Sequence, residues 1–231
     1  MQSIANNITS VQRRLQQAAC DAGRNPNDIL LMAVSKTRTH HDICQAFEAG
    51  LQSFGENYLQ EAVAKIAVLA EKPIEWHFIG PLQSNKTRLA AENFHWVHSV
   101  DRLKIAQRLN NQRAPELAPL NICLQINIDE EHSKSGFSSD EAVDIAHQVI
   151  ELPNLRLRGL MAIPKPRINT EEQRLPFRQL RELRDRINRS LDNSQKLDTL
   201  SMGMSDDLEA AIAEGATIVR IGTAIFGPRA T

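Results

Sequence analysis

Residues 29–37 read ILLMAVSKT, an apolar run of strand-forming length that ends in a lysine between two hydroxyl side chains. A short run of this kind, almost without polar interruption, is typical of a strand that is buried on both faces, as in a parallel sheet. Seven further β-rich runs follow, at 53–58, 75–80, 96–100, 121–128, 157–163, 199–204 and 217–226. The regular repetition of this pattern decides the fold class.

Segments with helical periodicity separate the runs. They lie at 39–49, 59–71, 85–94, 101–112, 139–151, 171–190 and 206–214, and one more, at 3–22, precedes the first run. Alternating strands and helices predict a parallel sheet with crossover helices. Eight evenly spread strands favour closure into an α/β fold, a (β/α)8 TIM barrel, and we expect one domain over residues 1–231. An open, doubly wound sheet is the alternative, although no GxGxxG motif follows the first run.

The composition limits the classes of partner. The formal net charge is −1 and 24% of the residues are charged, so there is no basic excess for nucleic acid. No apolar run reaches the roughly 18 residues that span a membrane, and the first residues lack a secretory pattern. The three cysteines form no CxxC pair, which argues against zinc and disulfides. We therefore expect a cytoplasmic protein with no metal site.

Lys36 is the first candidate functional residue, because the active sites of such barrels lie at the carboxyl ends of the strands. Alternation along the strand puts Met32, Val34 and Lys36 on one face, so Lys36 points into the barrel if Val34 does. An amine that loses hydration there favours its neutral, nucleophilic form. The alternative is a lysine that reaches from the strand end to water.

The runs at 199–204 and 217–226 supply a candidate phosphate site. In TIM barrels the loops after strands seven and eight often bind phosphate through backbone N–H groups. Here the strand ends carry Ser201, Gly222 and Thr223, which offer hydroxyl groups and a close backbone approach. In the alternative, Gly222 only bends the strand and Ser205 only caps a helix.

Arg220 shares a strand face with Ile218 and Gly222, so we expect its guanidinium inside the barrel mouth. A buried guanidinium needs a partner, which is either a ligand atom or a barrel carboxylate such as Glu75. A nucleophilic lysine, a phosphate cradle and an arginine that face one cavity together indicate pyridoxal 5'-phosphate (PLP) as the ligand.

Other polar or flexible side chains are weaker candidates. Asn57 ends the second run, where it donates to a ligand oxygen or caps the next helix. His77 shares a strand face with Glu75 and is more simply a hydrogen-bonded core histidine than a base. Asn127 and Met161 lie near the ends of the fifth and sixth runs, where they line the pocket or only close it.

Seven segments, spread in order over nearly the whole chain, resemble the motifs of the YggS/PROSC family of pyridoxal phosphate homeostasis proteins. They are AVSKT (33–37), FGENYLQE (54–61), WHFIGPLQSNK (76–86), INIDEEHSKSG (126–136), GLMAIP (159–164), GMSDDLEAAI (203–212) and VRIGTAIFG (219–227). The resemblance implies a single barrel similar to the N-terminal domain of bacterial alanine racemase. It also implies a protein that carries or buffers PLP in vitamin B6 and amino-acid homeostasis.

The resemblance further implies roles for individual residues. The lysine of AVSKT, Lys36, holds PLP as a Schiff base, and the arginine of VRIGTAIFG, Arg220, faces the pyridine nitrogen. By analogy with the racemase barrel, the phosphate lies near Ser201, Gly222 and Thr223. The cofactor ring is lined by Asn57, His77, Met161 and Met202.

The implied chemistry is binding more than catalysis, and we expect no catalytic residue. A guanidinium beside the pyridine nitrogen disfavours protonation of that nitrogen, so the ring is a poorer electron sink. Alanine racemase also uses a tyrosine from a second domain, whereas this sequence stops at Thr231 and its only tyrosine is Tyr58. We expect a monomer that passes PLP to apo-enzymes, with residues 164–170 as a candidate gate.

Three alternatives stay open at this point. A weak PLP-dependent amino-acid racemase needs a second acid or base near Lys36. A Schiff-base aldolase uses Lys36 on a sugar phosphate and binds it with the same phosphate cradle. A pure interaction protein keeps only the remnant of a site.

Overall fold

Eight parallel strands close into a barrel in the computed structural model, which describes residues 3–131 and 134–228. Each strand pairs with the next along the chain, and β8 pairs with β1. The strands are β1 (Leu30–Val34), β2 (Ser53–Glu56), β3 (Glu75–Phe78), β4 (Trp96–Val100), β5 (Leu120–Gln125), β6 (Leu155–Met161), β7 (Thr199–Ser201) and β8 (Ile218–Ile221). The predicted (β/α)8 fold class is therefore confirmed.

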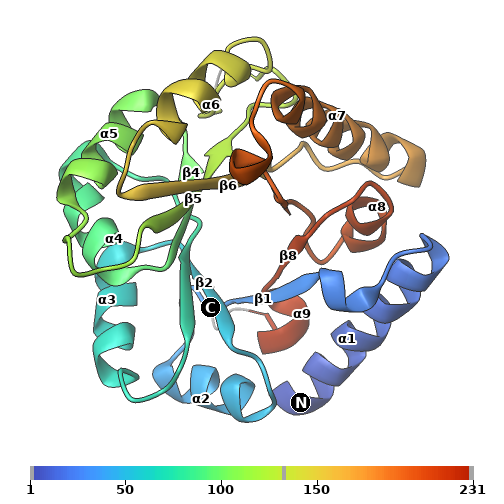
Figure 1. Ribbon diagram of the computed structural model, residues 1–231. Helices are drawn as coiled ribbons and strands as arrows, with labels where there is room; N and C mark the ends of the chain where they lie inside the picture. The colour runs from blue at the N-terminus through green and yellow to red at the C-terminus, as the bar shows by residue number, and fades with distance from the viewer. Residues whose placement is uncertain (1–2, 132–133, 229–231) are drawn as a thin grey trace.

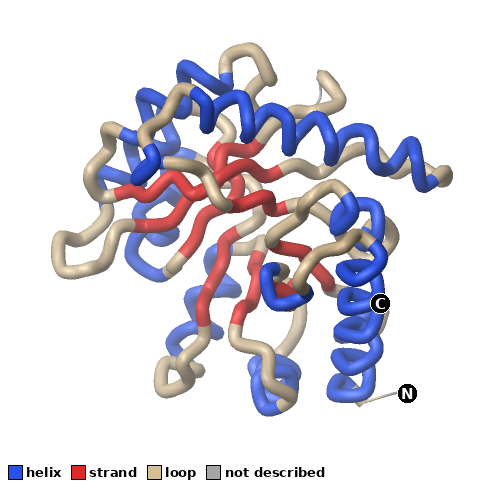
Figure 2. The backbone as a smooth tube through the Cα atoms, turned by 45° about the vertical axis from the view of Figure 1, so that its right-hand side comes forward, coloured by secondary structure: helices blue, strands red, loops and turns tan. Residues whose placement is uncertain are grey.

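Helices form a ring around the strands, as Figure 1 shows along the barrel and Figure 2 shows after a turn of 45°, with the strands in red. They are α1 (Ile4–Asp21), α2 (His40–Glu48), α3 (Leu59–Val68), α4 (Thr87–Asn93), α5 (Leu103–Gln112), α6 (Ala142–Ile150), α7 (Thr170–Arg189), α8 (Leu208–Ala213) and α9 (Thr223–Phe226). Short 3-10 turns span Pro26–Asp28, Ser84–Lys86 and Asn193–Gln195. Within the described ranges, no helix combines the length and apolar character needed to span a membrane.

One predicted strand is wrong in its second half. The sequence predicts a strand over 217–226, but β8 ends at Ile221 and the helix α9 follows. The β-branched and aromatic residues of this run favour a strand by propensity alone. Instead the chain leaves the sheet at Gly222, and Ile225 and Phe226 are buried in the hydrophobic core. Packing therefore overrides propensity in this segment.

The helix α1 closes the ring of helices between α2 and α8 (Figure 1). It packs against α8, α9 and α2. The side-chain amide of Asn7 donates to the Ile225 carbonyl at 2.8 Å, and Arg14 pairs with Glu209 at 2.9 Å. The buried face of α1 has helical spacing and consists of Ile8, Val11, Leu15, Ala18 and Ala19.

Two cores of different character lie on the two sides of the strands. The larger one is apolar and lies between the strands and the helices. The barrel interior holds a smaller apolar cluster of Trp96, Cys123 and Met161. It also holds buried polar side chains, among them His77, His98, Ser201 and Arg220. Buried polar groups are costly unless they are hydrogen-bonded, so the interior has to be built as a network.

Candidate functional site

Four of the predicted site residues lie at the carboxyl ends of neighbouring strands. Lys36 follows β1 by two residues and is half-buried, and Asn57 directly follows β2. Ser201 is the last residue of β7, and Gly222 directly follows β8. Because β1 lies between β2 and β8, and β7 adjoins β8, the strand order brings all four to one side of the barrel mouth.

Arg220 points into the barrel and is only 4% exposed. Its guanidinium donates to the Ser201 carbonyl, to Ser201 Oγ at 3.0 Å and to the Ala162 carbonyl at 2.9 Å. Burial lowers the pKa of Arg220 to about 10, so the group remains a cation at neutral pH. In the described part of the chain no carboxylate pairs with it, and Glu75 instead contacts His77. The prediction that Glu75 could be the barrel partner of Arg220 is thus wrong.

A chain of hydrogen bonds runs from Arg220 through the barrel interior. Ser201 Oγ, which accepts from the guanidinium, lies 2.7 Å from His98 Nδ1. His98 Nε2 lies 2.9 Å from His77 Nδ1, and His77 Nε2 lies 3.0 Å from Glu75 Oε2. The cation at the mouth and the carboxylate at the start of β3 are therefore joined through one hydroxyl and two imidazole rings.

The donors and acceptors of these hydrogen bonds can be assigned in one consistent order. The Glu75 carboxylate only accepts, so a neutral His77 donates to it from Nε2 and accepts at Nδ1 from His98 Nε2. A neutral His98 then accepts at Nδ1 the proton of Ser201 Oγ, which itself accepts from Arg220. Both imidazole rings are neutral in this arrangement, and burial lowers the pKa of each of them. The bond from His77 is the main cause that lowers the pKa of Glu75 to about 2.

We expect the neutral histidine pair to make the protein less stable in mild acid. In the unfolded chain both rings take up a proton near pH 6.5, whereas the folded protein keeps them neutral at that pH. The unfolded state then binds more protons, so stability is full above about pH 6.5 and falls as the pH drops below it. Each ring can contribute at most about 1.4 kcal/mol of loss for each pH unit below the pKa of the free imidazole.

Urea unfolding at a series of pH values measures this loss, which between pH 7.5 and 5.5 is at most about 3 kcal/mol for the two rings together. His98→Gln is the matched variant, because it removes one titrating ring and should lose about half of the pH slope. Glu75 does not contribute in this range, since its pKa of about 2 lies far below it. A pH slope that is the same in the wild type and in His98→Gln would show that His98 is not held neutral.

Ser201 Oγ has two partners inside the barrel. It accepts from Arg220 and lies 2.7 Å from His98 Nδ1, so the hydroxyl helps to hold the guanidinium in place. That Ser201 also binds the phosphate remains a prediction. The turn between β8 and α9 is the other part of the predicted phosphate cradle.

That turn leads into the amino end of the short helix α9. Gly222 is the N-cap of α9, and the first N–H groups of a helix have no acceptor within the helix. A Cβ atom added to Gly222 would lie 3.3 Å from the Val34 carbonyl oxygen, so glycine allows the turn to lie close to β1. Thr223 is exposed beside it and can add its hydroxyl.

Asn57 supplies a buried acceptor at the other side of Lys36. Its Oδ1 atom is buried and has no hydrogen-bond partner among the described residues. An unsatisfied buried oxygen is costly, so a donor on a bound molecule would be favoured here. A hollow of about 320 Å³ extends from Asn57 across the mouth to Asn127 and Ile163. A larger hollow of about 600 Å³ lies elsewhere, between α1 and the amino ends of β1 and β2.

The remaining predicted ring-lining residues divide into two groups. His77 and Met161 are buried inside the barrel, where Met161 packs with Trp96 and Cys123. Met202 is buried in the apolar core between the strands and the helices. Because it directly follows Ser201, alternation places its side chain on the opposite face of the strand. The structure therefore does not bring Met202 together with Ser201 and Arg220.

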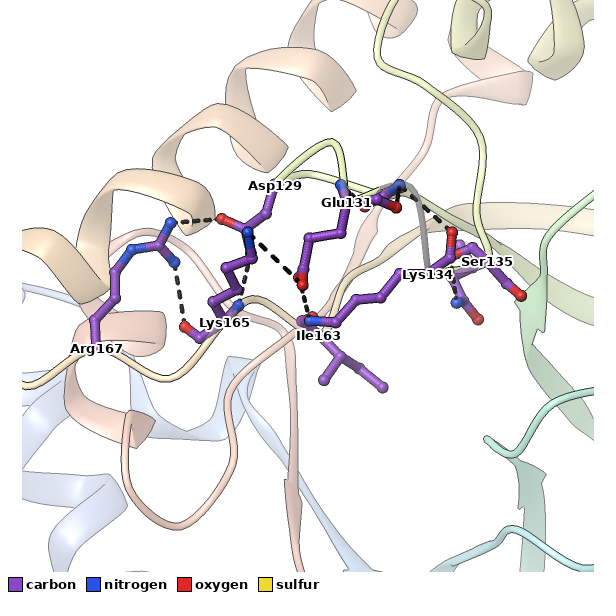
Figure 3. Close-up of polar contacts among 9 residues, drawn as sticks. Asp129, Glu131, Lys134, Ser135, Ile163, Lys165 and Arg167 are labelled. Carbon is purple, nitrogen blue, oxygen red and sulfur yellow. Dashed lines mark hydrogen bonds and ion pairs between the residues drawn. The ribbon is translucent and has the colours of Figure 1, made fainter.

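The loop that follows β6 is tied to the segment that follows β5, as Figure 3 shows. The Asp129 carboxylate accepts from the Lys165 backbone N–H at 2.6 Å and from Arg167 Nη2 at 2.5 Å. Lys134 Nζ donates to the Ile163 carbonyl at 3.4 Å. These contacts hold the predicted gating loop, 164–170, beside the hollow at the mouth.

Two sets of buried polar residues were not predicted from the sequence. His98 alternates with Trp96 along β4, and this spacing is the signal that places both side chains inside the barrel. Lys65 lies in α3 and is buried between Glu56 and Glu61. The spacing of Glu61 and Lys65 by four residues indicates a pair on one helix face, but nothing local indicates that the pair is buried.

The comparisons with known proteins agree with the fold. The chain matches the family described as alanine racemase, N-terminal domain, over residues 1–230. A pyridoxal phosphate homeostasis protein of Pseudomonas aeruginosa is 58% identical over 229 residues, which cover 99% of this chain and 97% of that protein. The chain belongs to the family of pyridoxal phosphate homeostasis proteins. The membership that the seven motifs indicated is thus confirmed.

Solved structures place the family in a wider fold group. PipY of Synechococcus elongatus, in its form with PLP bound, matches with a TM-score of 0.84 at 34% identity, covering 97% of this chain and all of PipY (100%). Alanine racemase from Corynebacterium glutamicum matches with a TM-score of 0.73 at 17% identity, covering 97% of this chain and 61% of the racemase. At this low identity the racemase shows the shared fold alone.

Proposed function

We propose that this protein binds PLP reversibly as a Schiff base on Lys36 and carries or buffers it in vitamin B6 and amino-acid homeostasis. The observation that carries the proposal is the meeting of Lys36, the buried cation Arg220 and the β8–α9 turn at one barrel mouth. Family membership and the PLP-bound form of PipY support it.

Each of the polar groups at the barrel mouth has a proposed role in binding PLP. When bound, PLP supplies an aldehyde that condenses with an amine and a ring that can withdraw electrons. Lys36 Nζ forms the C=N bond, and the aldehyde oxygen leaves as water, so the step involves no redox change. The N–H groups of the β8–α9 turn and the Thr223 hydroxyl hold the phosphate. Asn57 Oδ1 accepts from a polar group of the ligand.

Arg220 is proposed to face the pyridine nitrogen and to keep it unprotonated. The acceptors on Ser201 and Ala162 hold the guanidinium in place, and its remaining N–H groups can donate to the ring nitrogen. A ring without a proton on its nitrogen withdraws electrons weakly. The cofactor is thereby held without strong activation, which suits a carrier.

The proposal extends to the cellular setting. Since the C=N bond is reversible, an amine of an apo-enzyme can take over the aldehyde, and we propose such enzymes as partners. We further propose a monomer in the cytoplasm. The thiols of Cys20, Cys44 and Cys123 are free, as is usual in a reducing compartment.

The test is the absorption spectrum of the purified protein titrated with PLP, before and after borohydride, followed by peptide mapping of the reduced adduct. We expect a new absorption band with PLP and one adduct, on the peptide that contains Lys36. A protein that takes up no PLP, or one that is labelled elsewhere, would overturn the proposal. Incubation of the loaded protein with an apo-enzyme then tests transfer through the recovery of that enzyme's activity.

A further inference from the structure

The residue that follows Lys36 has an unusual backbone conformation. Thr37 has a φ angle of 62°, in the left-handed region that a β-branched residue rarely adopts. Such a conformation persists only where the surrounding structure fixes it, and it is found most often at functional sites. What holds Thr37 therefore bears directly on Lys36.

Thr37 is held by a cluster of charged and polar groups behind β1, which we call the Lys65 cluster. It consists of Lys65, Glu56, Glu61 and Ser35. Lys65 Nζ lies 2.8 Å from Glu56 Oε1 and 2.5 Å from Glu61 Oε1. The side chain of Glu56 is fully buried and that of Lys65 is only 8% exposed, whereas that of Glu61 is 31% exposed.

The Lys65 cluster forms hydrogen bonds with the backbone on both sides of Lys36. On the preceding side, Lys65 Nζ donates to the Ser35 carbonyl at 2.8 Å, and the Ser35 hydroxyl donates to Glu56 at 2.6 Å. On the following side, Glu61 Oε1 accepts from the Thr37 N–H at 2.7 Å. Both neighbours of Lys36 in the chain are thus fixed by charged side chains.

Lys36 and Thr37 are the central residues of a turn that follows β1, in which the Arg38 N–H donates to the Ser35 carbonyl at 3.0 Å. The cluster holds this turn at Ser35 and at Thr37, on both sides of Lys36. The cluster therefore acts on the backbone from which the Lys36 side chain departs. A lysine side chain is long and flexible, so the direction in which it leaves the backbone decides where its amine can reach.

A purely structural role does not require these groups. Apolar residues of similar volume stabilise a core as well as a buried ion pair does, or better, and glycine would adopt the conformation of Thr37 without strain. We propose that Lys65, Glu56 and Glu61 are positioning residues that aim Lys36 at the aldehyde of PLP by fixing Ser35 and Thr37. This inference rests on the proposed function.

Two variants separate positioning from stability. Thr37→Gly relieves the left-handed strain but lets the backbone beside Lys36 move, so PLP affinity should fall about tenfold while the melting temperature without PLP stays the same or rises. Glu61→Ala removes the acceptor of the Thr37 N–H and should also weaken PLP binding about tenfold. Glu61→Gln keeps an acceptor oxygen and should recover most of this affinity.

The measurement is the dissociation constant from a PLP titration followed by absorption, with the melting temperature taken on the same samples. Glu71→Ala is the matched control, because it removes an exposed carboxylate just after α3 and should bind PLP as the wild type does. If the wild type binds PLP and both Thr37→Gly and Glu61→Ala bind it within twofold of the wild type, the inference is wrong. If the wild type itself takes up no PLP, the proposed function fails, and this inference with it.

Discussion

The variant Lys36→Ala should fold like the wild type and lose the adduct that borohydride fixes at position 36. Lys36 lies beyond the end of β1 and is only half-buried, so its truncation leaves both cores intact. Without the ε-amine no C=N bond can form there, and PLP is held only by the polar contacts of the mouth. We expect the affinity for PLP to fall at least about tenfold, the equivalent of about 1.4 kcal/mol.

Peptide mapping after reduction and a PLP titration followed by absorption check this result. Lys104→Ala is a suitable control, since Lys104 is an exposed lysine of α5 on the outside of the barrel. It should keep the wild-type affinity and the adduct at Lys36. If Lys36→Ala kept both the spectrum and the affinity of the wild type, the amine at position 36 would not be the group that binds the aldehyde.

The variant Lys65→Met should lose about 3–5 kcal/mol of unfolding free energy at neutral pH, because it leaves the buried carboxylate of Glu56 without its cation. Burial raises the pKa of Glu56, and the Lys65 ammonium opposes that rise. Removing the ammonium therefore favours the protonated carboxyl in the folded state. A carboxyl with a raised pKa makes the folded state less stable as the pH rises, so the loss should be smallest in acid.

A double-mutant cycle with Glu56→Gln measures the coupling of the pair. The cycle compares the wild type, Glu56→Gln, Lys65→Met and the double variant, and urea unfolding gives all four free energies. We expect the double variant to be more stable than Lys65→Met alone, because the buried carboxylate that lost its cation is then replaced by a neutral amide. A double variant whose loss equals the sum of the two single losses would show that the two side chains do not act as a pair.

Much of the fold could be predicted because each strand and helix carries its own periodicity and the number of repeats limits the topology. The boundaries were less predictable, since strand propensity continues past the point where pairing stops. The run 199–204 illustrates this, because β7 ends at Ser201 while the next residues have left the sheet. The helix α9 was missed for the same reason.

The candidate site was predictable where it depends on the ends of strands. Lys36, Asn57 and Gly222 follow from the rule that a barrel exposes its chemistry at the carboxyl ends of its strands. The supporting groups were not predictable in this way. The partners of Arg220 come from β7 and the segment just after β6, and a partner of Lys65 comes from β2. Such contacts between distant segments leave no local pattern in the sequence.

The helix α1 has a consequence for the order in which the barrel forms. It packs against α8 and α9, and β1 pairs with β8. The hydrogen bond from Asn7 to Ile225 joins residues 218 positions apart. Contacts over such a separation form slowly because a long loop must close. We therefore expect the closure of the ring at α1 and β1 to be a late step of folding, after the local strand–helix units have formed.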